Sequence, residues 1–261
     1  MMQLPAITPA WPAPARVGSL FTTRAGGVST GCWGAAGAVG GLNLGANCGD
    51  EPARVASNRE RLVQAVGMPI NWLDQVHGAR VVQVTGAGRA DEEPVDAQAK
   101  ADAQVTWCTG VALGVLVADC LPVLLADRSG RAVGVAHAGW RGLAAGVLEN
   151  TVASMRSRHR DADLVAWLGP CIGPTAFEVG DDVLAAFAAQ DERAGAHFRP
   201  GVRPGKWLAD LSALARQRLQ ALGIDEVSAL NACTVSDGER FWSYRRDGVC
   251  GRMAGVIWLQ N

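Results

Sequence analysis

Residues 111–142 read VALGVLVADCLPVLLADRSGRAVGVAHAGWRG, and their pattern shows what kind of core this chain builds. A turn sequence, Asp127-Arg128-Ser129-Gly130, separates two apolar segments at residues 111–126 and 131–136, which is typical of a β-hairpin. The first segment carries a polar interruption, Ala118-Asp119-Cys120, after its strongest apolar run. The stretch therefore predicts buried strands with reactive side chains where the strands give way to loops.

Similar apolar segments recur along the chain and alternate irregularly with helical patterns. Further strands are predicted at residues 16–22, 81–85, 103–107, 164–168, 226–230 and 254–259. Apolar stripes with helical spacing predict helices over residues 51–66, 143–155, 181–190 and 207–222. Since these elements do not follow strict βαβ order, the expected fold class is α+β (mixed α/β), with mixed β-sheets flanked by helices.

Length and composition fit one compact domain. The chain has 261 residues, 49% of them hydrophobic and 19% charged, so it can bury a large core. Residues 1–15 are rich in proline and are expected to be an irregular lead-in, with one catalytic domain over residues 16–261. Three loops are predicted: a glycine-rich loop over 26–49, an acidic one over 91–96, and another over 191–205.

Charge and hydropathy exclude several classes of protein. The formal net charge is −1, and no basic face is evident, so a nucleic-acid partner is not expected. The N-terminus lacks the basic and apolar regions of a secretory signal, and no segment reaches the roughly 18 apolar residues of a membrane span. We therefore expect a cytoplasmic enzyme with a small-molecule substrate, without a membrane partner. Its seven cysteines include no CxxC pair and are expected to be mostly free thiols.

Three residues at predicted strand ends form a candidate metal site: His77, Cys120 and His137. Imidazole and thiolate suit zinc, and copper is an alternative. Three protein ligands leave a fourth position open, where zinc would lower the pKa of a bound water to about 7. Spacing alone leaves open a buried cysteine and two hydrogen-bonded histidines.

Basic side chains, several of them beside flexible glycines, form a second group. These candidates for gripping phosphate or carboxylate are Arg24, Arg141, Arg245, Arg246 and Arg252. Solvated surface arginines are the alternative.

Several other residues have two interpretations each. Cys171 is a nucleophile or a structural thiol, and Glu178 is a substrate contact or an acid leading into a helix. Asp102 and Asp119 either orient a ligand histidine or cap loops. Trp140 either stacks on a ligand or packs in the core.

The motifs TTRAGGVS, LNLG, QVHG, ADC, HAGWRG, GPCIG, FEVG and SYRRDG occur in this order. Together they resemble the laccase-domain family, once called multicopper polyphenol oxidases, over residues 16–258. The resemblance implies a fold similar to that of deamidating bacterial toxins with a Cys-His site. It implies that His77, Cys120 and His137 are the metal ligands and catalytic residues. The substrate-binding residues that it implies are Arg24, Asn43, Gln75, Arg141, Glu178, Arg245 and Arg246.

The resemblance implies two activities. Bacterial members are described as purine nucleoside phosphorylases, acting on adenosine, inosine, guanosine and methylthioadenosine, with adenosine deaminase activity. Others are described as peptidoglycan editing factors, which implies an amidase that removes L-serine from UDP-MurNAc-L-serine. Four histidines are too few for the copper set of a multicopper oxidase, and a vestigial binding protein is a further alternative. Phe177 and Cys250 replace the tyrosine and threonine common in the family, so hydroxyl contacts with substrate are in doubt.

Overall fold

A computed structural model describes residues 4–36, 38–86 and 99–261; the acidic loop expected at 91–96 lies outside them. The described strands form two large mixed sheets and one small sheet. The five-stranded sheet has the order β1 (Ala6–Ile7), β2 (Val17–Thr22), β15 (Met253–Leu259), β7 (Ala112–Val117) and β4 (Ile70–Asn71). The six-stranded sheet has the order β14 (Val227–Ala229), β10 (Leu164–Leu168), β8 (Leu121–Asp127), β9 (Val133–Ala138), β6 (Ala103–Thr106) and β5 (Val81–Val84).

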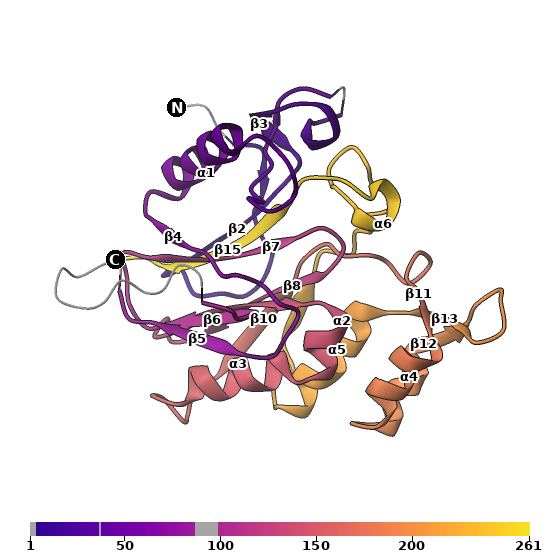
Figure 1. The fold of residues 1–261 in the computed structure, drawn as a ribbon. Helices are drawn as coiled ribbons and strands as arrows, with labels where there is room; N and C mark the ends of the chain where they lie inside the picture. Colours follow the sequence, from indigo (N-terminus) through magenta and orange to yellow (C-terminus); the bar gives the residue numbers. More distant parts are fainter. Residues whose placement is uncertain (1–3, 37, 87–98) are drawn as a thin grey trace.

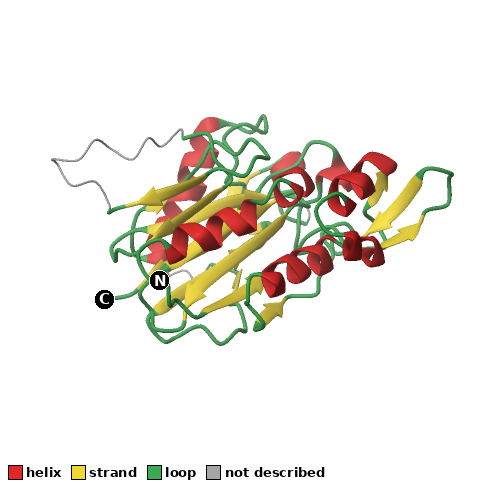
Figure 2. Ribbon diagram, turned by 90° about the horizontal axis from the view of Figure 1, so that it is seen from below, coloured by secondary structure: helices red, strands yellow, loops and turns green. Residues whose placement is uncertain are grey.

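The two large sheets pack face to face between outer helices (Figure 1). Alternate side chains of β7, such as Leu113 and Val115, meet Leu124 and Val135 of the six-stranded sheet in one buried cluster. Helix α1 (Pro52–Val66) covers the other face of the five-stranded sheet. Helices α2 (Trp140–Ala144), α3 (Val147–Arg156) and α5 (Leu211–Ala221) cover the outer face of the six-stranded sheet, as Figure 2 shows from below.

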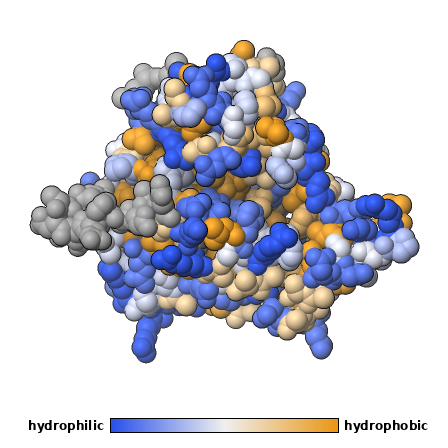
Figure 3. All heavy atoms as spheres, viewed as in Figure 1, coloured by the Kyte–Doolittle hydropathy of each residue, from blue (hydrophilic) through white to orange (hydrophobic). Residues whose placement is uncertain are grey.

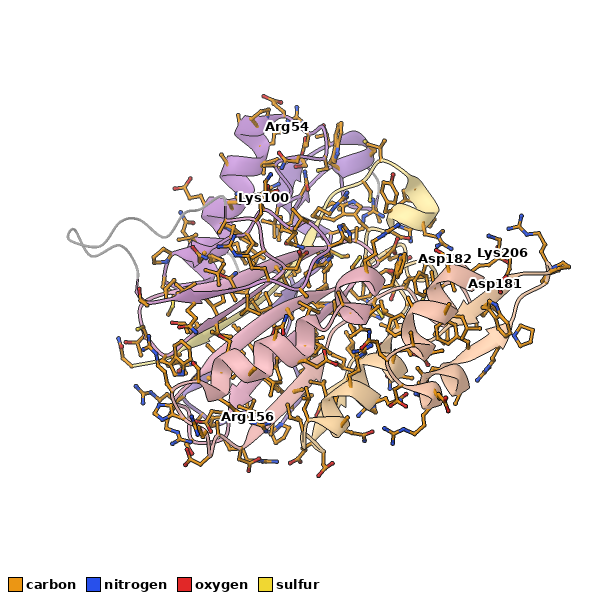
Figure 4. All side chains as sticks on the ribbon, turned by 60° about the horizontal axis from the view of Figure 1, so that its bottom comes forward. Arg54, Lys100, Arg156, Asp181, Asp182 and Lys206 are labelled. Carbon is orange, nitrogen blue, oxygen red and sulfur yellow. The ribbon has the colours of Figure 1, made fainter. Side chains whose placement is uncertain are left out.

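A small three-stranded sheet projects from one end of the molecule (Figure 1). It consists of β11 (Glu178–Gly180), β13 (Lys206–Ala209) and β12 (Phe198–Pro200), with α4 (Asp181–Ala188) and the 3₁₀ helix η2 (Glu192–His197) beside it. Asp181, Asp182 and Lys206 lie near one another at this projection (Figure 4). The remaining elements are β3 (Ala25–Ser29), the 3₁₀ helix η1 (Gly31–Trp33) and α6 (Tyr244–Asp247).

The predicted fold class is confirmed: helices flank mixed sheets. The predicted hairpin is also present, since β8 pairs with β9 from Leu121↔Ala138 to Ala126↔Val133. The expected helix over 207–222 begins only at Leu211, because Asp210 caps it by accepting the Ala213 N–H and residues 206–209 pair in the small sheet. The expected helix over 143–155 is broken at Gly146, whose φ is 91°.

Segments expected to be irregular contain short elements. The lead-in contributes β1 to the edge of the five-stranded sheet, and the glycine-rich segment 26–49 contains most of β3 and all of η1. The segment 191–205 contains η2 and β12. Among the described residues, no helix combines the length and apolarity needed to cross a membrane. Hydrophilic residues are interspersed with smaller hydrophobic areas on the face shown in Figure 3.

Candidate metal centre

Two of the three predicted ligands lie on links between the large sheets. Cys120 ends the short link 118–120, by which the chain leaves β7 in the five-stranded sheet and enters β8 in the six-stranded sheet. His77 lies on the link from β4 to β5, which also passes from one sheet to the other. His137 belongs to β9, where it pairs with Pro122, so the hairpin register brings it next to Cys120.

The three side chains converge on one point. Their ligand atoms, a nitrogen from each imidazole and the Cys120 Sγ, all lie within 4.8 Å of one another. The Cys120 Sγ is 3.9 Å from the His77 Nε2, and the two imidazole centroids are 4.8 Å apart at an interplanar angle of 76°. His77 is exposed, Cys120 is half-buried, and His137 is buried. The site is therefore open on the side of His77.

A single buried carboxylate positions both histidines. Asp102 Oδ1 accepts a hydrogen bond from the His137 Nδ1 at 2.8 Å and from the His77 N–H at 2.9 Å, while Oδ2 accepts the Gly78 N–H at 2.6 Å. These bonds hold His77 at a φ of 59°, a conformation that costs energy for a residue other than glycine. Because Nδ1 of His137 is engaged, its Nε2 is the nitrogen that can bind a metal.

The electrostatics favour a thiolate beside an imidazolium. Burial opposes ionisation of Cys120, but the charge of His137 and hydrogen bonds from both imidazoles lower the pKa of its thiol to about 6. Burial likewise opposes protonation of His137, but the Cys120 thiolate and the Asp102 hydrogen bond raise its pKa to about 9. A metal that binds all three residues must therefore displace the proton of His137.

The space between the three residues exists because residue 139 is glycine. A Cβ on Gly139 would lie 3.0 Å from the Cys120 Sγ, 3.1 Å from the His77 Cδ2 and 3.6 Å from the His137 Cε1. The φ of −61° and ψ of 154° at Gly139 suit any residue, so the backbone conformation does not require glycine. The donor set and the space beside Gly139 both fit a metal ion with a fourth position open to a ligand.

The candidate metal centre borders a cavity of about 920 Å³. Aromatic side chains in its lining include Trp72, Trp140, Phe177 and Tyr244. Trp140 has the Arg141 guanidinium over one ring face, 4.4 Å from the centroid. Phe177, which stands where a tyrosine is expected in the family, is buried, and the Arg245 Cζ lies 5.8 Å from its ring centroid. The cavity can hold a ligand larger than the metal and its open position.

Only two of the predicted substrate contacts outside the metal site line this cavity: Gln75 and Arg245. The Gln75 amide is committed to the edge of β7, where it donates to the Leu116 carbonyl at 2.8 Å and accepts the Leu116 N–H at 2.7 Å. Arg245 donates to the carbonyls of Ala176 and Glu178. Gln75 thus fastens the His77 link to the five-stranded sheet.

Five predicted substrate contacts lie outside the cavity lining: Arg24, Asn43, Arg141, Glu178 and Arg246. The guanidinium groups of Arg24 and Arg246 are bound to backbone carbonyls, those of Gly34 and Gly238 for Arg24 and those of Thr234, Val235 and Phe241 for Arg246. Asn43 is buried and donates to Asp50, and Glu178 pairs with Arg203. Arg141 is exposed beside Trp140, and the other four residues hold loops together.

The remaining candidates are buried side chains outside the set of three ligands. Asp119 does not orient a histidine; it accepts hydrogen bonds from Thr234 and the Arg245 N–H. Cys171 is buried beside Ser212, and burial raises the pKa of its thiol to about 12, which does not suit a nucleophile. Cys250 is also buried, and burial raises the pKa of its thiol to about 11.

The cavity-lining residues that sequence reasoning missed include Arg59 and Trp72, and it named Arg252 as a candidate for binding phosphate or carboxylate but not as a substrate-binding residue. Arg59 lies on α1 among other polar residues of that helix, so no local pattern distinguishes it. Arg252 follows a glycine in the manner of the other arginine candidates, and that signal applied to it equally well.

The chain is similar to known proteins over nearly its whole length. Residues 18–260 match the family described as multi-copper polyphenol oxidoreductase laccase. A purine nucleoside phosphorylase of Pseudomonas aeruginosa is 48% identical over 255 residues, which is 98% of each chain. Another of that name, YfiH of Escherichia coli, is 46% identical over 256 residues, 97% of this chain and 98% of that one.

Solved structures show the same fold over almost the whole chain. A Neisseria meningitidis protein matches with a TM-score of 0.86 at 45% identity, over 98% of this chain and 99% of that chain. YlmD from Geobacillus stearothermophilus matches with a TM-score of 0.85 at 30% identity, over 98% of this chain and all of that chain. This chain belongs to the multi-copper polyphenol oxidoreductase laccase family.

Proposed function

We propose that this protein is a metal-dependent enzyme of purine nucleosides, which uses phosphate to cleave the bond between base and ribose and also deaminates adenosine. The observation that carries the proposal is the convergence of His77, Cys120 and His137 at the border of a cavity of about 920 Å³. Relatives that match over nearly their full length are named purine nucleoside phosphorylases, which supports the substrate class.

We propose zinc as the metal, because one thiolate and two imidazoles leave a fourth position free for a substrate or water. When bound, zinc supplies an electrophile and lowers the pKa of a water molecule at the open position. Asp102 keeps the His137 Nε2 directed at the site, and Gly139 leaves the space. The aromatic lining, which includes Trp140 and Tyr244, offers surfaces on which a purine ring can stack.

Copper chemistry of the laccase type does not fit this chain. The whole sequence contains four histidines, and two of them, His77 and His137, belong to the centre just described. The other two, His159 and His197, do not belong to that cluster. A multicopper oxidase binds several copper ions largely through histidine, so we infer that the oxidase activity in the family's name is not the activity of this member.

One observation favours a second candidate, an amide hydrolase that acts on a cell-wall precursor such as UDP-MurNAc-L-serine. Cys120, His137 and Asp102 form a nucleophile, a base and a group that orients the base. In this reaction the thiolate attacks the amide carbon and the His137 imidazolium gives its proton to the departing amine. Water then hydrolyses the thioester, with His137 taking the proton, which releases the acid and restores the Cys120 thiolate.

One experiment separates the two candidates. Purified protein of measured metal content is incubated with adenosine, with and without phosphate, and with UDP-MurNAc-L-serine, and the products are identified by mass spectrometry. Phosphate-dependent adenine or phosphate-independent inosine supports the purine enzyme. Free serine with unchanged adenosine rejects it in favour of the hydrolase. Cys120→Ser is the control, because it removes the thiolate that both reactions need.

A further inference from the structure

Two half-buried arginines in the cavity have no carboxylate partner within the described parts of the chain. Arg59 of α1 and Arg252, which precedes β15, both line the cavity. Neither forms a salt bridge with the described residues, although many other arginines do, including Arg203, Arg218 and Arg246. Placing a cation in a partly desolvated cavity costs free energy unless an anion compensates it.

Arg59 is held in place but keeps most of its donors free. Its Nε donates to the Leu44 carbonyl at 2.9 Å, and its guanidinium lies over the Trp72 ring, 5.1 Å from the centroid. Trp72 lies against β7, where a Cβ on Gly114 would come within 2.7 Å of its ring. Both terminal nitrogens of Arg59 are without hydrogen-bond partners in the described part of the chain. Burial lowers the pKa of the group, which is the cost that a bound anion would offset.

Arg252 flanks the same loop from the other side. Its carbonyl accepts the Leu44 N–H at 3.1 Å, so both arginines are bound to the peptide groups of Leu44. A Cβ on Gly45 would lie 2.7 Å from the Arg252 Cγ, which shows how closely the side chain follows the loop. One terminal nitrogen, Nη1, donates to the carbonyls of Cys250 and Gly251, while no partner of Nε or Nη2 is found among the described residues.

Other arginines that were candidates for binding an anion are engaged elsewhere. Arg24 is also half-buried, but three contacts join its guanidinium to the carbonyls of Gly34 and Gly238, and it does not line the cavity. Arg246 donates to three carbonyls and pairs with Asp247. Arg59 and Arg252 therefore combine an unpaired charge, free donors and access to the cavity.

We propose that Arg59 and Arg252 form a subsite for a phosphate group, on the wall of the cavity made by residues 45–48. This inference rests on the proposed function, because the bound phosphate is taken to be a reactant or part of the substrate. It is either free inorganic phosphate, as in phosphorolysis, or the diphosphate of a nucleotide-linked substrate. Arginine suits both, because its planar fork presents parallel N–H groups to phosphate oxygens.

Calorimetric titration of the metal-loaded protein tests the subsite directly. Inorganic phosphate and UDP are titrated separately into the wild type and the Arg59→Gln, Arg252→Gln and Arg61→Gln variants. Arg61 is the matched control, because it lies on the same helix, carries the same charge and does not line the cavity. We expect Arg59→Gln and Arg252→Gln to weaken binding by about tenfold or more, as for lost charge-assisted hydrogen bonds. Arg61→Gln should bind like the wild type.

The outcomes are distinct. Weakened binding of phosphate identifies the free ion as ligand, and weakened binding of UDP alone identifies the diphosphate; either supports the subsite. The subsite is rejected if the wild type binds neither ligand, or if both cavity variants bind as tightly as the wild type. If Arg59→Gln does not fold, Arg59→Lys replaces it and should also bind phosphate less tightly, because it lacks the fork.

Titration also separates the subsite from the proposed function. Arginine-dependent phosphate binding without adenosine turnover would keep the subsite and reject the purine enzyme. Adenosine phosphorolysis with an unchanged KM for phosphate in both variants would support the purine enzyme and reject the subsite. Phosphate that binds at the metal instead should lose affinity in Cys120→Ser and keep it in both arginine variants, which would overturn the proposal.

Discussion

At the scale of single residues, Asp102 binds two of the three ligand residues and determines how each faces the site. Its carboxylate accepts N–H groups from the link that carries His77 and also the Nδ1–H of His137. The sequence showed that Asp102 or Asp119 could orient a histidine, but not which one. The choice depends on strand pairing, because the His137 N–H donates to the Asp102 carbonyl at 2.7 Å and so fixes the carboxylate beside the ring.

The convergence of the three candidate ligands could be predicted because each lies in a local motif, whereas most residues that line the cavity could not be predicted. Arg24 and Arg246 lie near glycines, as a phosphate-binding arginine often does. Their guanidinium groups instead donate to backbone carbonyls, those of Gly238 and Thr234 among them, which the motifs around the two arginines do not include. Arg59 shows the opposite case, since it reaches the cavity from the middle of an ordinary amphipathic helix. Which arginine is free depends on long-range packing that no short motif encodes.

Gly139→Ala should remove the metal and leave the fold intact. The added methyl group would lie 3.0 Å from the Cys120 Sγ, in the space that the metal needs, while the backbone conformation accepts alanine. Zinc content by plasma mass spectrometry should fall to near zero, with a thermal midpoint close to that of the metal-free wild type. Gly195→Ala is the control, because a Cβ there meets nothing within 4 Å. A variant that keeps full zinc would show that the metal does not lie between the three residues.

In metal-free protein, Cys120 should be alkylated by iodoacetamide at a lower pH than the other cysteines. Its pKa is lowered to about 6, so the thiolate forms as pH rises through that value and the rate should be nearly constant above pH 7. Cys171, with a pKa raised to about 12, should stay unmodified at pH 8. Peptide mass spectrometry at several pH values measures both rates. A Cys120 profile that still rises between pH 8 and 9 would contradict the thiolate–imidazolium pair.

At the scale of elements, the sequence predicts individual strands and helices better than their partners. The strands β7 and β8 were read as parts of one apolar segment, 111–126, but they belong to different sheets, and the Ala118-Asp119-Cys120 link joins them. A strand buried on both faces has the same composition in either sheet, so its apolar pattern does not reveal that the chain passes from one sheet to the other. The late start of α5 was recognisable, because Asp210 is a typical N-cap.

The link between β7 and β8 should depend on Asp119 for its stability. Asp119 has a φ of 89°, and its carboxylate joins the link to Thr234 and to the start of α6, which carries Tyr244 and Arg245 to the cavity. Asp119→Asn tolerates this φ and retains one acceptor, so it should cost about 1 kcal/mol of unfolding free energy. Asp119→Ala strains the backbone and leaves two donors without an acceptor, so it should cost about 2–4 kcal/mol.

Urea denaturation of the two Asp119 variants measures these differences, and substrate KM reports the position of α6. The alanine variant should raise KM more than the asparagine variant, because the cavity wall formed by Tyr244 and Arg245 loses its anchor. Equal stability of the two variants would mean that the carboxylate does not hold the link.

At the scale of the whole molecule, the candidate centre connects the two large sheets. His77 and Cys120 lie on separate links between the sheets, and His137 lies on a strand of the six-stranded sheet. The mixed-sheet architecture was predictable from the irregular order of strands and helices. The stacking of the sheets was not, because burial on two faces looks alike in a sandwich and in a single covered sheet.

Because its ligands come from three segments far apart in the chain, the metal should stabilise the whole fold. An ion that binds only the folded state at a free concentration one hundred times its Kd adds about 2.7 kcal/mol. For a chain of this size, that should raise the thermal midpoint by about 5–10 °C. Differential scanning calorimetry of metal-free protein, with and without added zinc, measures the shift. For Cys120→Ser, which keeps both histidines, added zinc should raise the thermal midpoint much less. An equal rise in the variant would mean that zinc stabilises the protein through another site.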